Sequence, residues 1–224
     1  MTGAAEKTVE RFTDRQEAGQ ELAEAVEKAL DGEEVIVLAL PRGGVPVAAE
    51  VADRLGAPLD VLLVRKLGVP WQPEMAFGAI ATGDILATND DHVKALGLKQ
   101  DLIHDIVERE RAELDRREQL YRDGRPPIDI AGKTVVVVDD GIATGSTVRA
   151  ALKTLERRGV KKRVVACPVA AAETVRALEK LADQVICLRT PKAPFGAVGT
   201  WYEDFAPVFD SEVKKLLDGY SASE

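Results

Sequence analysis

Short apolar runs alternate with longer amphipathic segments along most of the chain. Five runs have apolar centres and predict strands that are buried on both faces of a parallel sheet: 35–40, 59–64, 133–140, 163–170 and 184–190. Five segments carry apolar residues three and four positions apart and predict helices: 14–30, 46–55, 101–122, 147–157 and 172–182. This alternation predicts an α/β fold with a doubly wound, mainly parallel sheet.

One region interrupts the alternation. Two prolines and a glycine in 67–75 predict a loop. Two short apolar stretches around Gly83 and Asp84 predict a hairpin over 77–88.

Composition and charge narrow the class of protein. The 224 residues are 46% hydrophobic and 30% charged, which predicts a single soluble domain over 1–224. The net charge of −8 argues against a nucleic-acid-binding surface. The first residues, MTGAAEKTVERF, lack the apolar stretch typical of a signal peptide, and no run of about 20 apolar residues is present, so we expect a cytoplasmic protein with no membrane contact. Cys167 and Cys187 lie in apolar runs and are expected to be buried thiols.

The strongest candidate site is VVVVDDGIATGST at 135–147. Asp139 and Asp140 end the apolar run, and small residues then lead into a helix: Gly141, Ala143, Thr144, Gly145, Ser146 and Thr147. Exposed backbone N–H groups at a helix N-terminus bind phosphate, and carboxylates bind hydroxyl groups or a metal. A ribose 5-phosphate satisfies both requirements. No lysine follows the glycine, so the loop is not a Walker A loop.

Two further segments add positive charge. LPRGG at 40–44 combines Arg42 with Gly43 and Gly44, which allow a close approach to the backbone. Arg65 and Lys66 stand at the expected end of the second strand. Three cations at strand ends of an acidic protein predict a bound polyanion.

These motifs resemble those of the type I phosphoribosyltransferases. The layout of RQEAG, LPRGG, VRKLG and VGTWYEDF resembles a bacterial group of this family with no assigned base. The resemblance implies transfer of the phosphoribosyl group of phosphoribosyl pyrophosphate (PRPP) to a nitrogenous base or amine. Asp139 and Asp140 would hold the ribose hydroxyls, and the loop from Gly141 to Thr147 would hold the 5-phosphate, chiefly through Ala143 to Thr147. The diphosphate would meet five residues: Arg42, Gly43, Gly44, Arg65 and Lys66.

The resemblance also implies a mobile hairpin lid over 67–90 and a small C-terminal hood over 191–210. Glu74 in the lid is a candidate proton-handling residue, and the hood would bind the base through Phe195, Val198 and Trp201. The same aromatic residues could equally form a packing cluster. Mg²⁺ would bridge the diphosphate and the ribose, and would reach Asp139 and Asp140 indirectly through PRPP and water.

Three more expectations follow from the resemblance. The family often has a cis peptide before its pyrophosphate-loop residue, here Pro41–Arg42. Members that use 6-oxopurines have an aspartate where this chain has Ala143, which disfavours hypoxanthine and guanine. A homodimer is expected.

Two other functions remain open on the sequence. One is a PRPP-sensing regulator with the same fold. The other is a Mg²⁺-dependent phosphatase or phosphotransferase that uses the acid pair.

Overall fold

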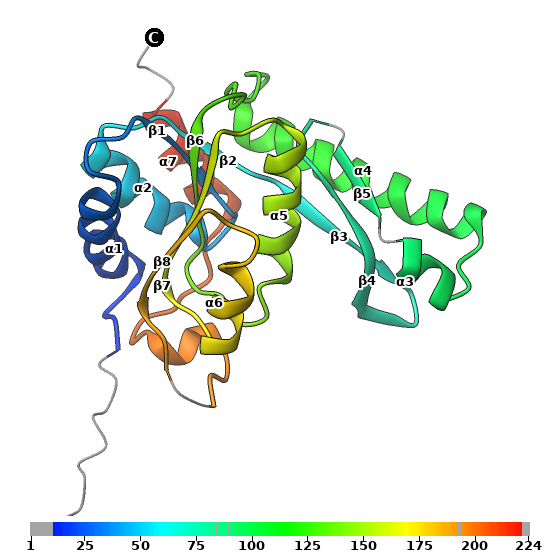
Figure 1. Ribbon diagram of the computed structural model, residues 1–224. Coiled ribbons are helices and arrows are strands. Elements are labelled where there is room, and N and C mark those ends of the chain that lie inside the picture. The colour runs from blue at the N-terminus through cyan, green and yellow to red at the C-terminus, as the bar shows by residue number, and fades with distance from the viewer. Residues whose placement is uncertain (1–10, 84, 89, 192–193, 221–224) are drawn as a thin grey trace, which may run out of the picture.

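The core of the protein is a five-stranded sheet in which every neighbouring pair is parallel (Figure 1). The computed structural model describes residues 11–83, 85–88, 90–191 and 194–220, without the side chains of 72–75, 87, 90 and 91. The strand order is β2-β1-β6-β7-β8. The strands are β1 (Val35–Ala39), β2 (Leu59–Val61), β6 (Thr134–Val138), β7 (Lys162–Val169) and β8 (Gln184–Arg189). The predicted α/β architecture is therefore confirmed.

Alternate residues of each strand enter two separate cores, because successive side chains point to opposite faces of a sheet. Val37, Ala39 and Val136 belong to one core, whereas Leu38 and Val137 belong to the other. Both faces are thus covered, which is why the strands are apolar at nearly every position.

Helices on the two faces complete these cores. On one face pack α1 (Arg15–Leu30), α2 (Gly44–Leu55) and α7 (Asp210–Gly219). On the other face pack α5 (Ser146–Arg157) and α6 (Ala172–Leu178). The Asp14 side chain accepts a hydrogen bond from the Glu17 amide at 2.9 Å, which confirms the predicted start of α1. Two other boundaries differ from the prediction, since α2 begins at Gly44 and α6 ends at Leu178.

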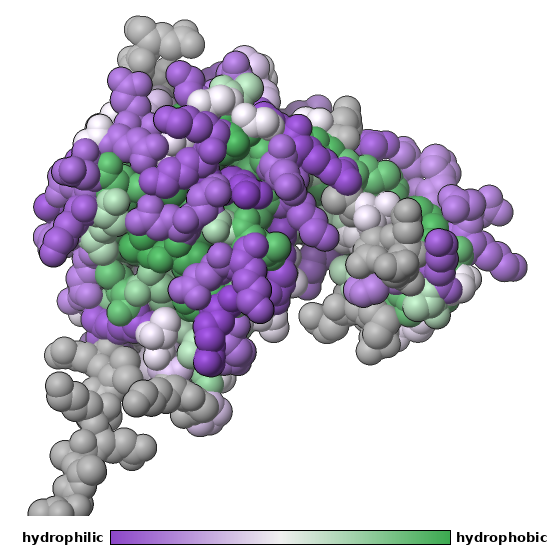
Figure 2. Space-filling view, viewed as in Figure 1, coloured by the Kyte–Doolittle hydropathy of each residue, from purple (hydrophilic) through white to green (hydrophobic). Residues whose placement is uncertain are grey.

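An arm projects from this body (Figure 1). It contains an antiparallel sheet of β3 (Val64–Val69), β4 (Gln72–Ala81) and β5 (Ile85–Thr88), together with α3 (Asp90–Ala95) and α4 (Gln100–Arg122). The predicted hairpin is confirmed as β4 and β5. Figure 2 shows the arm as a lobe that a hollow separates from the body.

Two expectations about this region are wrong. The run 59–64 is not one strand, because β2 ends at Val61 and β3 begins at Val64 in a different sheet. Leu62 and Leu63 join the two strands and are both buried, so a continuous apolar run hides the break.

The segment 67–75 is also not a loop. A tight turn at 70–71 joins β3 to β4, and Val69 pairs with Gln72. Leu67 and Val69, two positions apart, both belong to the core, and this spacing is typical of a strand. The proline and glycine content concealed this alternation, although Pro70 lies in the turn, where no amide donor is needed.

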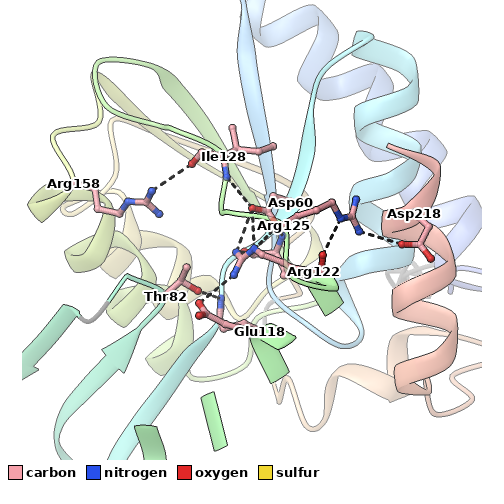
Figure 3. A network of polar contacts seen from close by, with 10 residues as sticks. Asp60, Thr82, Glu118, Arg122, Arg125, Ile128, Arg158 and Asp218 are labelled. Carbon is pink, nitrogen blue, oxygen red and sulfur yellow. Dashed lines mark hydrogen bonds and ion pairs between the residues drawn. The ribbon is translucent and has the colours of Figure 1, made fainter. Parts of the chain in front are cut away.

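A buried ion pair fastens the arm to the sheet edge (Figure 3). Asp60 of β2 and Arg122 at the end of α4 are 8% and 5% exposed, with Arg122 Nε 3.2 Å from Asp60 Oδ1. Arg122 also donates to the Val61 carbonyl at 2.8 Å and to Glu118 at 3.1 Å, and the Ile128 amide donates to Asp60. The charged groups of Asp60 and Arg122 therefore both have hydrogen-bonding partners inside the protein. None of the helices in the described ranges is long and apolar enough to cross a membrane.

Removing the Asp60 carboxylate should destabilise the protein strongly. Asp60→Ala leaves the buried Arg122 without its main partner, and we expect the free energy of unfolding to fall by about 3–5 kcal/mol in urea denaturation. As a control, Glu113→Ala removes partly exposed ion pairs with Arg116 and Arg117, for which we expect a loss of about 1 kcal/mol or less. Equal losses in the two variants would contradict this role for Asp60.

Candidate active site

The candidate site lies where the strand order of the main sheet reverses. From β1 the chain passes to β2 on one side, whereas β6 continues to β7 and β8 on the other. Ligands of open α/β sheets bind at the carboxyl ends of the strands at such a switch point. The loops after β1 and β6 meet here, and the Leu40 amide donates to the Val138 carbonyl at 2.9 Å. The motifs at 40–44 and 135–147 are therefore brought together.

Gly43 and Gly44 pack directly against the acid pair. A Cβ atom on Gly43 would lie 1.9 Å from Asp140 Oδ2, and one on Gly44 would lie 2.7 Å from the Val138 carbonyl oxygen. These glycines therefore leave room for the acidic strand end. The Pro41–Arg42 peptide is cis, as the family resemblance implied.

Asp139 and Asp140 lie in different surroundings. Asp139 is partly exposed, and its Oδ1 accepts the Asp140 amide at 3.0 Å. Asp140 is 9% exposed. Although Asp139 as a whole keeps some exposed surface, desolvation of its carboxyl group and the neighbouring Asp140 charge raise its pKa well above the usual range. Burial also raises the pKa of Asp140, but a hydrogen bond from Arg15 opposes this rise.

Sequence reasoning missed Arg15. Its Nε lies 2.8 Å from Asp140 Oδ2, although the two residues are 125 positions apart. The RQEAG segment predicted a helix and contributed to the family resemblance, but no spacing rule links Arg15 to a distant acid.

The loop before α5 has the features of a phosphate site. Its N-cap residue Gly145 has φ +69° and supplies no side-chain cap for the first amides of α5. The Thr174 hydroxyl donates to the Ala143 carbonyl at 2.6 Å, and Arg149 donates to the Thr144 carbonyl. Both hydrogen bonds fix the loop through its carbonyl groups and do not use its amides. The uncapped N-terminus can accept an anion.

Arg65 and Arg42 pair with carboxylates of α4 and of α7. Arg65 Nη2 is 2.6 Å from Glu110 Oε2, and Arg42 Nη1 is 3.8 Å from Asp210 Oδ1. Neither Glu110 nor Asp210 was singled out in the sequence.

The expected placement of Arg65 and Lys66 at a strand end is wrong. Both lie inside β3, where neighbouring side chains point to opposite faces of the small sheet. The side chains of Arg65 and Lys66 therefore cannot bind one anion from the same face of the sheet. Arg65 lines a small cavity of 20 Å³ together with Pro41 and Thr147. The three sequence motifs therefore meet at this cavity.

The hood residues form the aromatic packing cluster that the sequence left open. The rings of Phe195 and Trp201 stack with centroids 5.8 Å apart, and Trp201 Nε1 donates to the Phe195 carbonyl at 3.0 Å. A Cβ on Gly141 would lie 2.3 Å from Val198, so the 3₁₀ helix η1 (Val198–Trp201) touches the start of the phosphate loop. Glu74 belongs to β4, but its side chain lies outside the described part of the protein.

The acid pair fits a magnesium ion only as an auxiliary partner. Within the described ranges, no three His, Cys, Asp or Glu side chains form a metal-binding cluster. Mg²⁺ prefers one or two carboxylates together with phosphate oxygens and water. Asp139 and Asp140 suit that arrangement, with the ligand supplying the remaining oxygens.

This strand order with these strand-end motifs defines a type I phosphoribosyltransferase fold. A family model described as the phosphoribosyl transferase domain matches residues 8–203, so the chain belongs to that family. A solved structure from Thermus thermophilus is 43% identical, with a TM-score of 0.85 over 95% of this chain and 100% of that chain.

Curated relatives agree with this assignment. A protein of Mycobacterium tuberculosis (strain ATCC 25618 / H37Rv) with a provisional phosphoribosyl transferase name is 47% identical over 207 residues, 92% of this chain. The bifunctional protein PyrR of Chloroflexus aurantiacus is 37% identical over 126 residues, 55% of this chain and 63% of that protein. The chain spans about half the length of the mycobacterial relative, 46%.

Gly43→Ala should disturb the site by steric pressure alone. Gly43 has φ −60° and ψ −31°, which alanine adopts readily, but the new methyl group would overlap Asp140. We expect a loss of about 1–3 kcal/mol of unfolding free energy. Gly219→Ala is the control, because a Cβ there meets nothing within 4 Å. Wild-type stability of Gly43→Ala would refute the close packing.

Asp139→Asn should stabilise the protein at pH 8. A raised pKa means that the carboxyl contributes stability when protonated and loses it as pH rises through the folded-state pKa. Removing the charge should raise Tm, by about 2–4 °C for each kcal/mol gained in the free energy of unfolding. This gain should shrink toward pH 4.

The control is Asp183→Asn, where a hydrogen bond from the Arg163 amide lowers the pKa of the carboxyl. Its stabilisation is present at pH 8, so this variant should melt at a lower temperature than wild type. A lower Tm for Asp139→Asn as well would contradict the electrostatic account.

Proposed function

We propose that this chain transfers the 5-phosphoribosyl group of PRPP to a nitrogenous base or amine and releases pyrophosphate, with Mg²⁺. One observation carries the proposal: at the switch point between β1 and β6, Asp139 and Asp140 lie next to the N-terminus of α5. The N-cap residue of that helix is Gly145, which provides no side-chain cap. A phosphate and a diol need these two features side by side.

The residues divide between the parts of PRPP. The amides from Ala143 to Thr147, with the hydroxyls of Ser146 and Thr147, bind the 5-phosphate. Asp139 and Asp140 face the ribose and favour the positive charge that develops on it. Arg42 and Arg65, with the backbone of 43–44, stabilise the leaving diphosphate.

The reaction breaks the bond between ribose C1 and the diphosphate oxygen and forms a bond from C1 to the acceptor nitrogen. The diphosphate leaves with the electron pair of the broken bond, and the acceptor nitrogen loses its proton. Bound Mg²⁺ would neutralise charge on the diphosphate and assist its departure. Ala143 offers no base for the proton, which disfavours a 6-oxopurine acceptor.

The acceptor should lie beside the hood. Val198 adjoins Gly141, so a base packed against Phe195, Val198 or Trp201 would lie close to ribose C1. We further expect a homodimer that acts on small molecules and not on nucleic acid.

A product assay distinguishes this function from the two others. The protein is incubated with PRPP, Mg²⁺ and a panel of purines, pyrimidines and amines, and pyrophosphate and inorganic phosphate are measured separately. We expect pyrophosphate release that depends on one acceptor class. PRPP binding without release would indicate a regulator, and phosphate release would indicate a phosphatase; either result would contradict the proposal.

Arg65 should matter more for PRPP than Lys66. Arg65 lines the cavity with Pro41 and Thr147, whereas Lys66 points to the other face of β3. We expect Arg65→Ala to raise the KM for PRPP by about tenfold, the effect of roughly 1.4 kcal/mol, and Lys66→Ala to raise it by less. The reverse order would show that β3 presents its other face to the ligand.

A further inference from the structure

The diphosphate part of the proposed site lacks one of the cations that the sequence predicted for it. Arg65 and Lys66 are neighbours in β3, so their side chains lie on opposite faces of the small sheet. Of the predicted cations, only Arg42 and Arg65 therefore remain to meet the diphosphate. A diphosphate carries several negative charges, and another arginine at this place would bind it through charge-assisted hydrogen bonds.

Helix α4 of the arm brings Arg117 to this place. Arg117 lines the cavity of 20 Å³ at which the three sequence motifs meet, and so lies beside Pro41 and Thr147. Leu114, three residues before Arg117 and therefore on the same face of the helix, is buried and lines the same cavity. The cavity has room for about one water molecule, so it marks the contact between α4 and the two loops and not the position of a diphosphate.

Arg117 also lies near Arg42 of the loop after β1. Tyr121, four residues after Arg117 on the same face of α4, donates to Asp210 at 2.5 Å. Asp210 is the carboxylate that lies 3.8 Å from Arg42. Burial and the hydrogen bond to Asp210 raise the pKa of Tyr121 to about 12, and the positive charges of Arg117 and Arg42 oppose this rise. The two arginines therefore approach the same phenol, one from the arm and one from the body.

Two carboxylates of α4 fix the orientation of the arginine side chains on the arm. Arg117 donates through Nε to Glu113 at 2.7 Å, and its two terminal nitrogens have no hydrogen-bond partner among the described residues. Arg65 donates through Nε and Nη2 to Glu110 at 2.9 and 2.6 Å, and these bonds do not use Nη1. Each guanidinium is therefore oriented at one edge and can donate to a ligand from another, with little further loss of side-chain entropy.

We propose that Arg117 is a further diphosphate-binding residue, which acts with Arg42 and Arg65 on the leaving group. This inference rests on the proposed function for the identity of the ligand. Because Arg65 lies in β3 and Arg117 in α4, the arm supplies two of the three arginines and is itself a part of the PRPP site. Sequence spacing does not single out Arg117, since it lies among many charged residues of a long helix.

A pair of ligands that differ only in the diphosphate tests this role. PRPP and ribose 5-phosphate share the sugar and the 5-phosphate, so a residue that binds the diphosphate should affect only PRPP. For Arg117→Gln, we expect the affinity for PRPP with Mg²⁺, measured by calorimetry, to fall by about tenfold or more, while the affinity for ribose 5-phosphate changes by less than about twofold. Equal losses for the two ligands, or wild-type affinity for both, would overturn the proposal.

Arg116→Gln is the matched control. Arg116 is the preceding residue, pairs with the same Glu113 at 2.8 Å and does not line the cavity. Its side chain is 56% exposed, against 29% for that of Arg117. The control removes the same charge from the same turn of α4, and the affinity for PRPP should stay at the wild-type value. An equal loss in both variants would show a general effect of net charge and would overturn the proposal.

Arg117→Lys makes the test independent of the stability of the glutamine variant. Lysine keeps the positive charge beside Glu113 but has no planar fork of donors, so the affinity for PRPP should fall by less than in Arg117→Gln. Ribose 5-phosphate should bind as it does to the wild-type protein. A matching loss of affinity for ribose 5-phosphate would overturn the proposal.

Two outcomes separate this inference from the proposed function. Pyrophosphate release by the wild-type protein, together with an unchanged affinity of Arg117→Gln for PRPP, would contradict only the role of Arg117. A lowered affinity of Arg117→Gln for PRPP, without pyrophosphate release by the wild-type protein, would support that role and contradict only the transfer.

Discussion

The complete burial of β1 and β6 is the constraint on which the rest of the structure depends. All five residues of each strand are buried, because helices cover both faces of the sheet. Neither strand contains a charged residue, and the charged residues that follow them stand where the chain leaves the two cores. Asp139, Asp140 and Arg42 all stand just past such an end, and the strand order brings the ends together. The chemistry of the site follows from the packing of the sheet.

Charge in this site is balanced locally by residues from elsewhere in the chain. Asp140 pairs with Arg15 of α1, Arg42 with Asp210 of α7, and Arg65 with Glu110 of α4. A diphosphate would offer anionic oxygens to Arg42 and Arg65, and a diol would offer hydroxyl donors to the carboxylates. Binding would therefore exchange internal ion pairs for contacts with the ligand, at a smaller desolvation cost than exposing bare charges.

Much of this architecture could be predicted from local sequence. Continuous valine runs indicated the buried strands, and Asp139–Asp140 with the following small residues indicated the phosphate loop. The break at Leu62–Leu63 could not be predicted, since both sides of it are equally apolar. The pairing of Arg15 with Asp140 was also hidden, because it depends on how α1 and the segment around Phe205 meet in space.

The most direct test is a crystal structure of the protein with PRPP and Mg²⁺. The account predicts that the 5-phosphate lies on the amides of Ala143 to Thr147 at the start of α5, with the ribose hydroxyls against Asp139 and Asp140 and the diphosphate beside Arg42. A ligand bound with its 5-phosphate away from this loop, or with its ribose remote from the acid pair, would contradict the account.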